Sequence, residues 1–240
     1  MARPQRIEYE GAFHHVMSRG NDGVPIFRDD TDRLQFLALL AYVIVRFNWV
    51  LHDWVLMTNH FHLAIEAGEC TLSRGMHWLL GAYAQWFNRR HGRTGHLYDR
   101  RFKNLLVENE EYLLTVTRYI ALNPVKAGIV ARPEDYVWSS YRARAAYEAA
   151  PSWLTMGAVQ AMFGADPQEG REAYRTFVDE GMSEPRDLAE IFINKLFLGS
   201  AEWMETMQTL VDGTERSEEA PRSQVHPGRP AIQDLSLIHI

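Results

Sequence analysis

The chain has little cysteine: Cys70 is the only one among 240 residues. A single thiol excludes an internal disulfide and any zinc site built from two or more thiolates. No apolar run approaches the roughly 20 residues that a membrane-spanning helix needs, and the first residues lack the apolar segment of a secretory signal. No glycine-rich loop ending in Gly-Lys-Ser or Gly-Lys-Thr is present, so we expect no nucleotide cofactor. We therefore expect a soluble, cytoplasmic protein that does not bind a membrane.

The chain also lacks an excess of positive charge, with 25 Lys+Arg against 31 Asp+Glu and a formal net charge of −6. The charge is unevenly distributed. Residues 1–150 hold 18 basic and 16 acidic side chains, a formal +2, whereas residues 151–240 hold 7 and 15, a formal −8. Because nucleic-acid binding depends on local basic patches, the acidic total does not exclude a nucleic-acid partner for the first part.

Over the first 150 residues, apolar side chains alternate between the period of strands and the period of helices. Strands are expected at 12–18, 50–57, 61–67 and 102–108, and helices at 30–47, 72–88 and 110–122. This order, β-α-β-β-α-β-α, predicts an antiparallel sheet with helices packed on one face. That arrangement is a ferredoxin-like α+β sandwich.

The strand patterns stop after about residue 150. We expect residues 1–150 to form the functional domain, 151–212 an acidic helical extension, and 213–234 a linker rich in Ser, Pro, Glu and Arg. The last six residues, 235–240, match the translation of the mosaic-end DNA of sequencing adapters. We expect the natural chain to continue past Asp234, and a longer read of the locus tests this.

Two histidines, His60 and His62, flank Phe61 in an expected strand. Because side chains alternate along a strand, the histidines share one face while Phe61 points to the other. Their Cα atoms are about 6.6 Å apart, so both imidazoles can reach one divalent ion at about 2.1 Å. The alternative is that both rings lie on a solvent-exposed face and bind nothing.

The helix expected at 110–122 carries Tyr119, and Asn123 follows one turn later. Residues four apart lie on the same face of a helix, about 6 Å apart along its axis. A phenol and an amide oxygen can therefore serve the same small site. Two alternatives remain open: Tyr119 is a buried aromatic, or Asn123-Pro124 begins a new helix as its N-cap and first residue.

A local basic cluster lies between residues 89 and 103, where six cations are opposed only by Asp99, giving a formal +5. Aromatic and histidine side chains are interspersed among them. Cations that follow phosphates and rings that stack on bases are typical of single-strand-binding surfaces. The alternative is a solvated loop without a ligand.

Several motifs resemble one protein family. Residues 55–63, which contain His60-Phe61-His62, resemble the HUH motif of single-strand-specific DNA transposases. Residues 118–130 are similar to the tyrosine-bearing helix of the REP-associated tyrosine transposases. Shorter segments match the same family in order over residues 1–145: 18–21, 25–29, 72–76, 87–92, 95–97, 101–103 and 138–141.

The resemblance implies that His60, His62 and Asn123 bind Mg²⁺ or Mn²⁺ and that Tyr119 is the nucleophile. Such an enzyme cleaves and rejoins single-stranded, hairpin-forming DNA through a 5′-phosphotyrosine intermediate, without ATP, during DNA transposition. It would act as a monomer or homodimer in the bacterial cytoplasm, at the nucleoid. The residues expected to bind the nucleic acid are Arg19, Asn21, Arg74, Arg89, Arg90, Arg93, Arg100, Arg101 and Lys103.

Two other functions are compatible with the same residues. A domesticated relative would hold hairpin DNA without cutting it. A metallo-hydrolase of small phosphoesters would use His60 and His62 with a water nucleophile, and would need neither Tyr119 nor the basic cluster.

Overall fold

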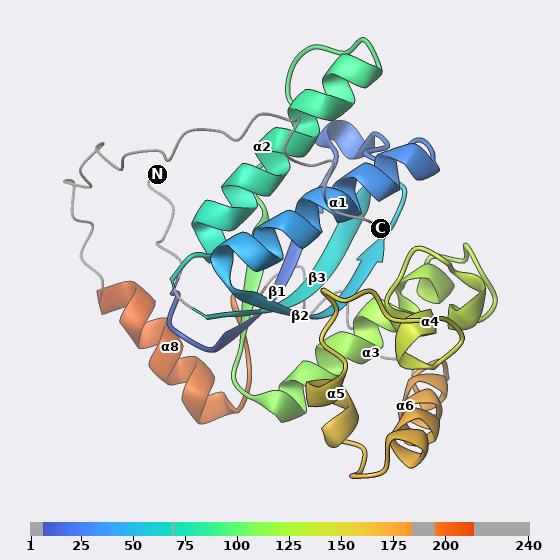
Figure 1. The fold of residues 1–240 in the computed structure, drawn as a ribbon. Helices are drawn as coiled ribbons and strands as arrows, with labels where there is room; N and C mark the ends of the chain where they lie inside the picture. Colours follow the sequence, from blue (N-terminus) through green and yellow to red (C-terminus); the bar gives the residue numbers. More distant parts are fainter. Residues whose placement is uncertain (1–6, 69, 184–194, 214–240) are drawn as a thin grey trace.

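The computed structural model describes residues 7–68, 70–183 and 195–213, and its core is a five-stranded sheet in the order β2-β3-β1-β4-β5 (Figure 1). The strands are β1 (Ala12–Arg19), β2 (Trp49–Leu56), β3 (His60–Ala67), β4 (Lys103–Val107) and β5 (Phe197–Leu198). The α-helices are α1 (Asp30–Phe47), α2 (Leu72–Arg90), α3 (Glu110–Lys126), α4 (Tyr141–Arg144), α5 (Gly157–Ala161), α6 (Pro167–Glu180) and α8 (Ala201–Gly213). Short 3₁₀ turns lie at Asn21–Gly23 and Pro133–Asp135. The fold is α+β, as predicted.

The first four strands are antiparallel to their neighbours, and the expected order of strands and helices is confirmed. The fifth strand was not predicted. It pairs with β4 in parallel, through Leu106↔Phe197 and Val107↔Leu198, so the sheet is mixed. A two-residue strand is too short to show a hydrophobic period. The sequence analysis therefore did not detect it in a region that was expected to be helical.

Helices cover both faces of the sheet, so the expectation that they pack on one face is wrong. Alternate residues of β3 belong to two separate cores: Phe61 and Leu63 pack with α1 and α2, whereas Ala64 packs with α3. In Figure 1, α1 and α2 lie side by side over one face, and α3 crosses the other. The sheet is apolar on both faces, and its buried α3 side also carries His62. His62 therefore lies between β3 and the helix α3 that covers this face.

Local signals explain where α1 and α3 begin. The Asp29 side chain accepts a hydrogen bond from the backbone N–H of Asp32 at 3.1 Å, and α1 ends at Asn48, whose φ is 50°. Asn109 caps α3 by accepting from two backbone N–H groups of its first turn. The helix continues through Pro124 to Lys126, so the alternative in which Asn123 begins a new helix is wrong.

A buried ion pair fixes the segment after α3 to the edge strand β2. The guanidinium of Arg144 donates to the Asp53 carboxylate at 2.9 Å, and both side chains are 1% exposed. Ser140 donates to the same carboxylate at 2.6 Å and accepts from the backbone N–H of Trp54 at 2.9 Å. The backbone N–H of Leu56 donates to a carbonyl of the same segment. These bonds cover the free edge of β2, which protects it from pairing with another chain.

The later helices form two groups on the main fold. One group, α5 and α6, packs through an apolar cluster against α3 and α4. The other is α8, which packs beside β5 through Phe197 and Trp203. The proposed domain boundaries stay a prediction. Residues 184–194 and 214–240 lie outside the described residues, and they include the expected linker after its first residue, Gly213, and the last six residues. Within the described ranges, every helix is too short or too polar to cross a lipid bilayer.

Candidate active site

The two histidines of β3 form the centre of the candidate site. Their ring centroids are 5.0 Å apart and their planes are nearly perpendicular, at 88°. His62 is 2% exposed, whereas His60, at the end of the strand, is partly exposed. His60 therefore lies at the entrance of the site and His62 at its base.

Asn123 of α3 contacts both histidines. Its Nδ2 lies 3.4 Å from Nε2 of His62. It also hydrogen-bonds His60, an interaction that opposes the lowering of the His60 pKa by burial. The side chain of Asn123 therefore lies against both imidazoles.

Tyr119 lies one turn before Asn123 on α3 and is partly buried. Its ring centroid is 5.2 Å from that of His62, with an interplanar angle of 88°. The ring also meets His15 of β1 at 5.7 Å and 83°. The structure thus brings Tyr119, Asn123 and the β3 histidines together, because α3 packs on the face of the sheet that carries them.

Burial keeps these imidazoles neutral. It lowers the pKa of His15 to about 3 and that of His60 to about 4, where a nearby Arg19 charge adds to the effect. Burial also holds the pKa of His62 well below its ordinary value, with repulsion from the two neighbouring histidines contributing. A neutral imidazole has a ring nitrogen lone pair free to bind a metal ion, and a protonated one does not.

The donor set suits a divalent cation that completes its coordination from outside the chain. Among the described residues, no three side chains of His, Cys, Asp or Glu are grouped as metal ligands. His60 and His62 offer two neutral nitrogens, and Asn123 offers an amide oxygen. Nitrogen and neutral oxygen ligands fit Mn²⁺ or Mg²⁺, with water or a phosphate supplying the remaining positions.

Two basic residues expected to bind nucleic acid lie in register with the histidines. Arg19 is the partner of His60 across β1 and β3, and its side chain is exposed. Lys103 and His62 are both partners of Met17, on opposite sides of it, so they share one face of the sheet. Both cations therefore lie on the β1 and β4 side of the histidine pair, where they would meet the phosphates next to a bound scissile group.

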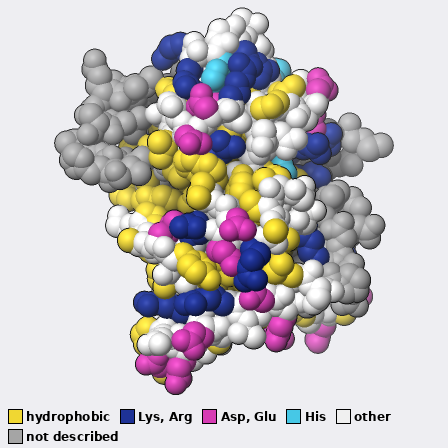
Figure 2. Space-filling view, turned by 90° about the vertical axis from the view of Figure 1, so that its right-hand side faces the viewer, with side chains coloured by type: hydrophobic (Ala, Val, Ile, Leu, Met, Phe, Trp, Pro, Cys, Tyr) yellow, Lys and Arg dark blue, Asp and Glu magenta, His cyan; other side chains and the backbone are white. Residues whose placement is uncertain are grey.

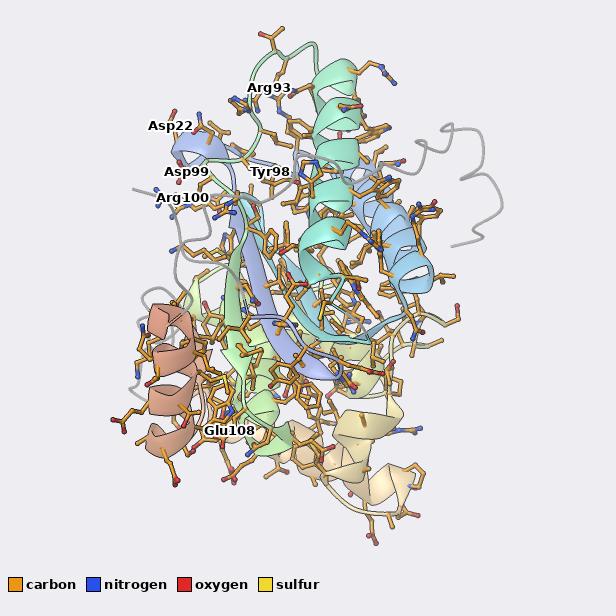
Figure 3. The ribbon with its side chains drawn as sticks, turned by 90° about the vertical axis from the view of Figure 1, so that its left-hand side faces the viewer. Asp22, Arg93, Tyr98, Asp99, Arg100 and Glu108 are labelled. Atoms are coloured by element: carbon orange, nitrogen blue, oxygen red, sulfur yellow. The ribbon has the colours of Figure 1, made fainter. Side chains whose placement is uncertain are left out.

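The basic loop after α2 is held at the same end of the sheet. The backbone N–H of Asn21 donates to the Leu97 carbonyl at 2.9 Å, and that of Asp99 donates to the Arg19 carbonyl at 3.1 Å. Asp22, Asp99 and Arg100 lie together there, with Arg93 farther along the loop (Figure 3). Figure 2 shows Lys, Arg and His side chains gathered at this end of the molecule.

Acidic residues distant in the sequence neutralise part of this cluster. Arg90 donates to Asp29 at 2.8 Å and also to buried Asp32. Arg100 pairs with Asp99 at 2.8 Å. Sequence spacing predicted only Asp99 as an opposing charge, because Asp29 and Asp32 reach the loop through the packing of α1 on α2. The net positive charge is therefore smaller than the +5 counted along the chain.

The other arginines that were expected to bind nucleic acid lie at different places. Arg89 and Arg101 are exposed, and the guanidinium of Arg93 lies 5.7 Å from the centroid of the Phe87 ring. Arg74 lies near the opposite end of α2, over Phe47 at 5.5 Å. Fifteen residues of helix separate Arg74 from Arg89, about 22 Å, so the structure does not bring Arg74 to the site.

Two side chains of the site were missed by the sequence analysis, His15 and Asn59. Nε2 of His15 lies 2.9 Å from Nδ1 of His62, and Oδ1 of Asn59 lies 2.7 Å from Nδ1 of His60. The position of Asn59 directly before His60 was an available signal. That of His15 was not, because the pairing register of β1 with β3 sets its contact with His62.

Part of the chain is similar to known proteins in sequence and in fold. Residues 9–123 match the family model described as "Transposase IS200 like". A solved structure described as a REP-associated tyrosine transposase bound to a REP hairpin matches with a TM-score of 0.51 at 20% identity, over 65% of this chain and 92% of the other. The tRNA(His) guanylyltransferase of Saccharomyces cerevisiae gives a TM-score of 0.38 at 10% identity, over 77% and 85%. No curated protein matches this chain.

Proposed function

We propose that this chain, whose residues 9–123 match the model of the IS200-like transposases, is a transposase of that kind and cleaves and rejoins single-stranded, hairpin-forming DNA through a covalent bond to Tyr119. One observation carries the proposal: Tyr119 and Asn123 of α3 meet His60 and His62 of β3 on a single face of the sheet. The family and the fold fit DNA transposition, and the residue roles follow from this convergence.

In the proposed site, His60, His62 and Asn123 hold Mg²⁺ or Mn²⁺. The bound ion would neutralise charge on the scissile phosphate and orient that group. The two imidazoles are suited to this role because burial keeps them neutral near pH 7. Tyr119 lies one helical turn before Asn123 on α3, and its ring centroid is 5.2 Å from that of His62.

Tyr119 acts as the nucleophile. Its phenolic oxygen loses its proton and forms a bond to the phosphorus atom, while the bond from phosphorus to the 3′-oxygen breaks and that oxygen takes up a proton. The products are a 5′-phosphotyrosine and a free 3′-hydroxyl. Because one phosphodiester replaces another, a second 3′-hydroxyl can reverse the step without ATP.

The basic end of the sheet binds the DNA strand. Arg19 and Lys103 lie on β1 and β4, to one side of the histidines, and exposed Arg89 and Arg101 extend the positive surface along the loop after α2. The structural neighbour that is described with a REP hairpin supports a hairpin substrate for this chain too. We expect the protein to act at the nucleoid of a bacterial cell, as a monomer or a homodimer.

A covalent-adduct assay tests this function. The full chain is incubated with 5′- or 3′-labelled hairpin oligonucleotides carrying single-stranded flanks, with Mn²⁺, and run on a denaturing gel. We expect the 3′ label to migrate with the protein and the 5′ label to be released on the free fragment. The adduct should disappear in Tyr119→Phe, while hairpin binding persists. Tyr112→Phe is the matched control, since Tyr112 lies two turns earlier on α3 and packs on the same core.

The same assay separates the two rival functions. A protein that binds hairpins but forms no adduct with any of them is a binding module. Hydrolysis of a small phosphodiester that survives Tyr119→Phe indicates a metallo-hydrolase using water. Either result contradicts the proposed function.

A further inference from the structure

We propose that His15 is a positioning residue that holds His62 in the tautomer with its proton on Nδ1, which leaves Nε2 of His62 unprotonated on the side of Asn123. The inference rests on the proposed function, since an unprotonated Nε2 matters only if His62 binds a metal ion. The tautomer itself is a property of the metal-free protein and can be measured there.

The geometry places His15 directly against His62. In the pairing of β1 with β3, Met17 is the partner of His62, so His15 lies two residues along the same face. The planes of the two rings are 9° from parallel and their centroids are 5.0 Å apart, so the facing nitrogens meet edge to edge. Nε2 of His15 and Nδ1 of His62 are 2.9 Å apart, a hydrogen-bond distance.

In the metal-free protein the amide of Asn123 presents Nδ2 to His62, and this orientation allows one arrangement of protons on His62. A neutral imidazole carries one N–H, so one of the two facing nitrogens donates and the other accepts. Nδ2 of Asn123, which can only donate, lies 3.4 Å from Nε2 of His62. Nε2 is therefore the acceptor, and the proton of His62 lies on Nδ1 and is donated to His15.

His60 has a matching arrangement built from a different residue. The amide Nδ2 of Asn59 donates to the Gly23 carbonyl at 3.1 Å, which fixes the orientation of that amide. Its Oδ1, an acceptor, then faces Nδ1 of His60 at 2.7 Å. Both histidines thus carry their proton on Nδ1. Metal-binding histidines usually have a partner on the nitrogen that does not bind the ion, and losing it typically costs 10–100-fold in metal affinity.

The contact between His15 and His62 lies in a buried part of the molecule. His15 and His62 are 3% and 2% exposed, beneath α3. The imidazole of His15 supplies an acceptor and also packs at 83° against the ring of Tyr119, the proposed nucleophile, with the centroids 5.7 Å apart. One side chain of β1 therefore contacts a proposed metal ligand and the proposed nucleophile.

Three variants separate hydrogen bonding from packing. His15→Phe keeps a ring in the core and against Tyr119 but removes the acceptor. His15→Gln keeps an amide oxygen near the position of Nε2. His14→Phe is the matched control, because His14 is the neighbouring buried histidine of β1, is 1% exposed and points to the opposite face.

The first measurement is the tautomer of His62 in the metal-free protein, read from two-bond ¹H–¹⁵N NMR spectra of ¹⁵N-histidine-labelled chain. We expect the Nδ1–H pattern in wild type, His15→Gln and His14→Phe, and a change to Nε2–H or a mixture in His15→Phe. An Nε2–H pattern in the wild type, or an unchanged Nδ1–H pattern in His15→Phe, overturns the inference. This readout does not depend on whether the protein cuts DNA.

The second measurement is Mn²⁺ affinity, followed by electron paramagnetic resonance without DNA. We expect His15→Phe to weaken binding about 10–100-fold while His15→Gln and His14→Phe stay near wild type. An equal loss in His14→Phe would assign the effect to disturbance of β1 and overturn the inference. If wild type and His60→Ala both bind no Mn²⁺, the metal role in the proposed function fails, and the NMR result alone decides the role of His15.

Discussion

Lowering the pH should unfold this protein through its buried histidines. Burial lowers the pKa of His15 to about 3, and that of His52 and His60 to about 4. Burial also places the pKa of His62 well below its ordinary value. As the pH falls below about 6.5, the unfolded chain takes up to four protons on these histidines that the folded chain does not bind. Stability is therefore fully present above that pH and decreases as the pH falls toward the folded-state values.

The size of the effect follows from the number of protons. Each proton that only the unfolded state binds changes stability by about 1.4 kcal/mol per pH unit. Between pH 6 and pH 5 the unfolded histidines are on average about nine-tenths protonated, so four of them cost about 4–5 kcal/mol. That loss is comparable with the whole stability of many domains, about 5–15 kcal/mol. Carboxyl groups with ordinary pKa values titrate mostly below this range.

Urea denaturation at pH 7, 6 and 5, in buffer with a metal chelator, measures this loss. His52→Gln is the informative variant, because His52 contacts Glu66 and lies outside the proposed metal site. It should reduce the loss between pH 6 and 5 by about a quarter, since it removes one of four titrating groups. A wild-type loss below about 1 kcal/mol over that interval would refute the reasoning that these imidazoles are neutral because they are buried.

Two further predictions concern charges. Arg101→Ala should reduce the slope of log affinity for hairpin DNA against log salt concentration by about one, whereas Arg74→Ala, at the other end of α2, should leave it unchanged; equal slopes for all three proteins would remove Arg101 from the DNA surface. Arg144→Met should cost about 3–5 kcal/mol in urea denaturation because it leaves the buried Asp53 carboxylate uncompensated, and adding Asp53→Leu should recover most of that loss. A single variant within about 1 kcal/mol of wild type would show that the pair is not required for stability.

Sequence patterns were sufficient for the first four strands and for α1, α2 and α3, and for residues that share a face within one element. The helix expected at 30–47 was found with those bounds because Asp29 caps it and Asn48 ends it in a left-handed conformation. The shared face of His60 and His62 follows from strand alternation, and that of Tyr119 and Asn123 from helical spacing. Such relations involve only neighbours along the chain.

Relations between distant segments were not accessible in the same way. The packing of α3 on the second face of the sheet depends on tertiary contacts, because the strands carry apolar residues on both sides. The ion pairs of Arg90 depend on how α1 crosses α2. The contact of His15 with His62 depends on strand register, which a one-residue shift would abolish.

The central claim is that the phenolic oxygen of Tyr119 becomes bonded to the 5′-phosphate of the cut strand. Tandem mass spectrometry of the protein after reaction with a hairpin oligonucleotide and Mn²⁺, followed by nuclease and protease digestion, tests it directly. We predict a nucleotide phosphate attached to the peptide that contains Tyr119, with fragment ions that place it on that residue. A cleaved oligonucleotide with an unmodified Tyr119 peptide, or a phosphate attached to another residue, would contradict the account.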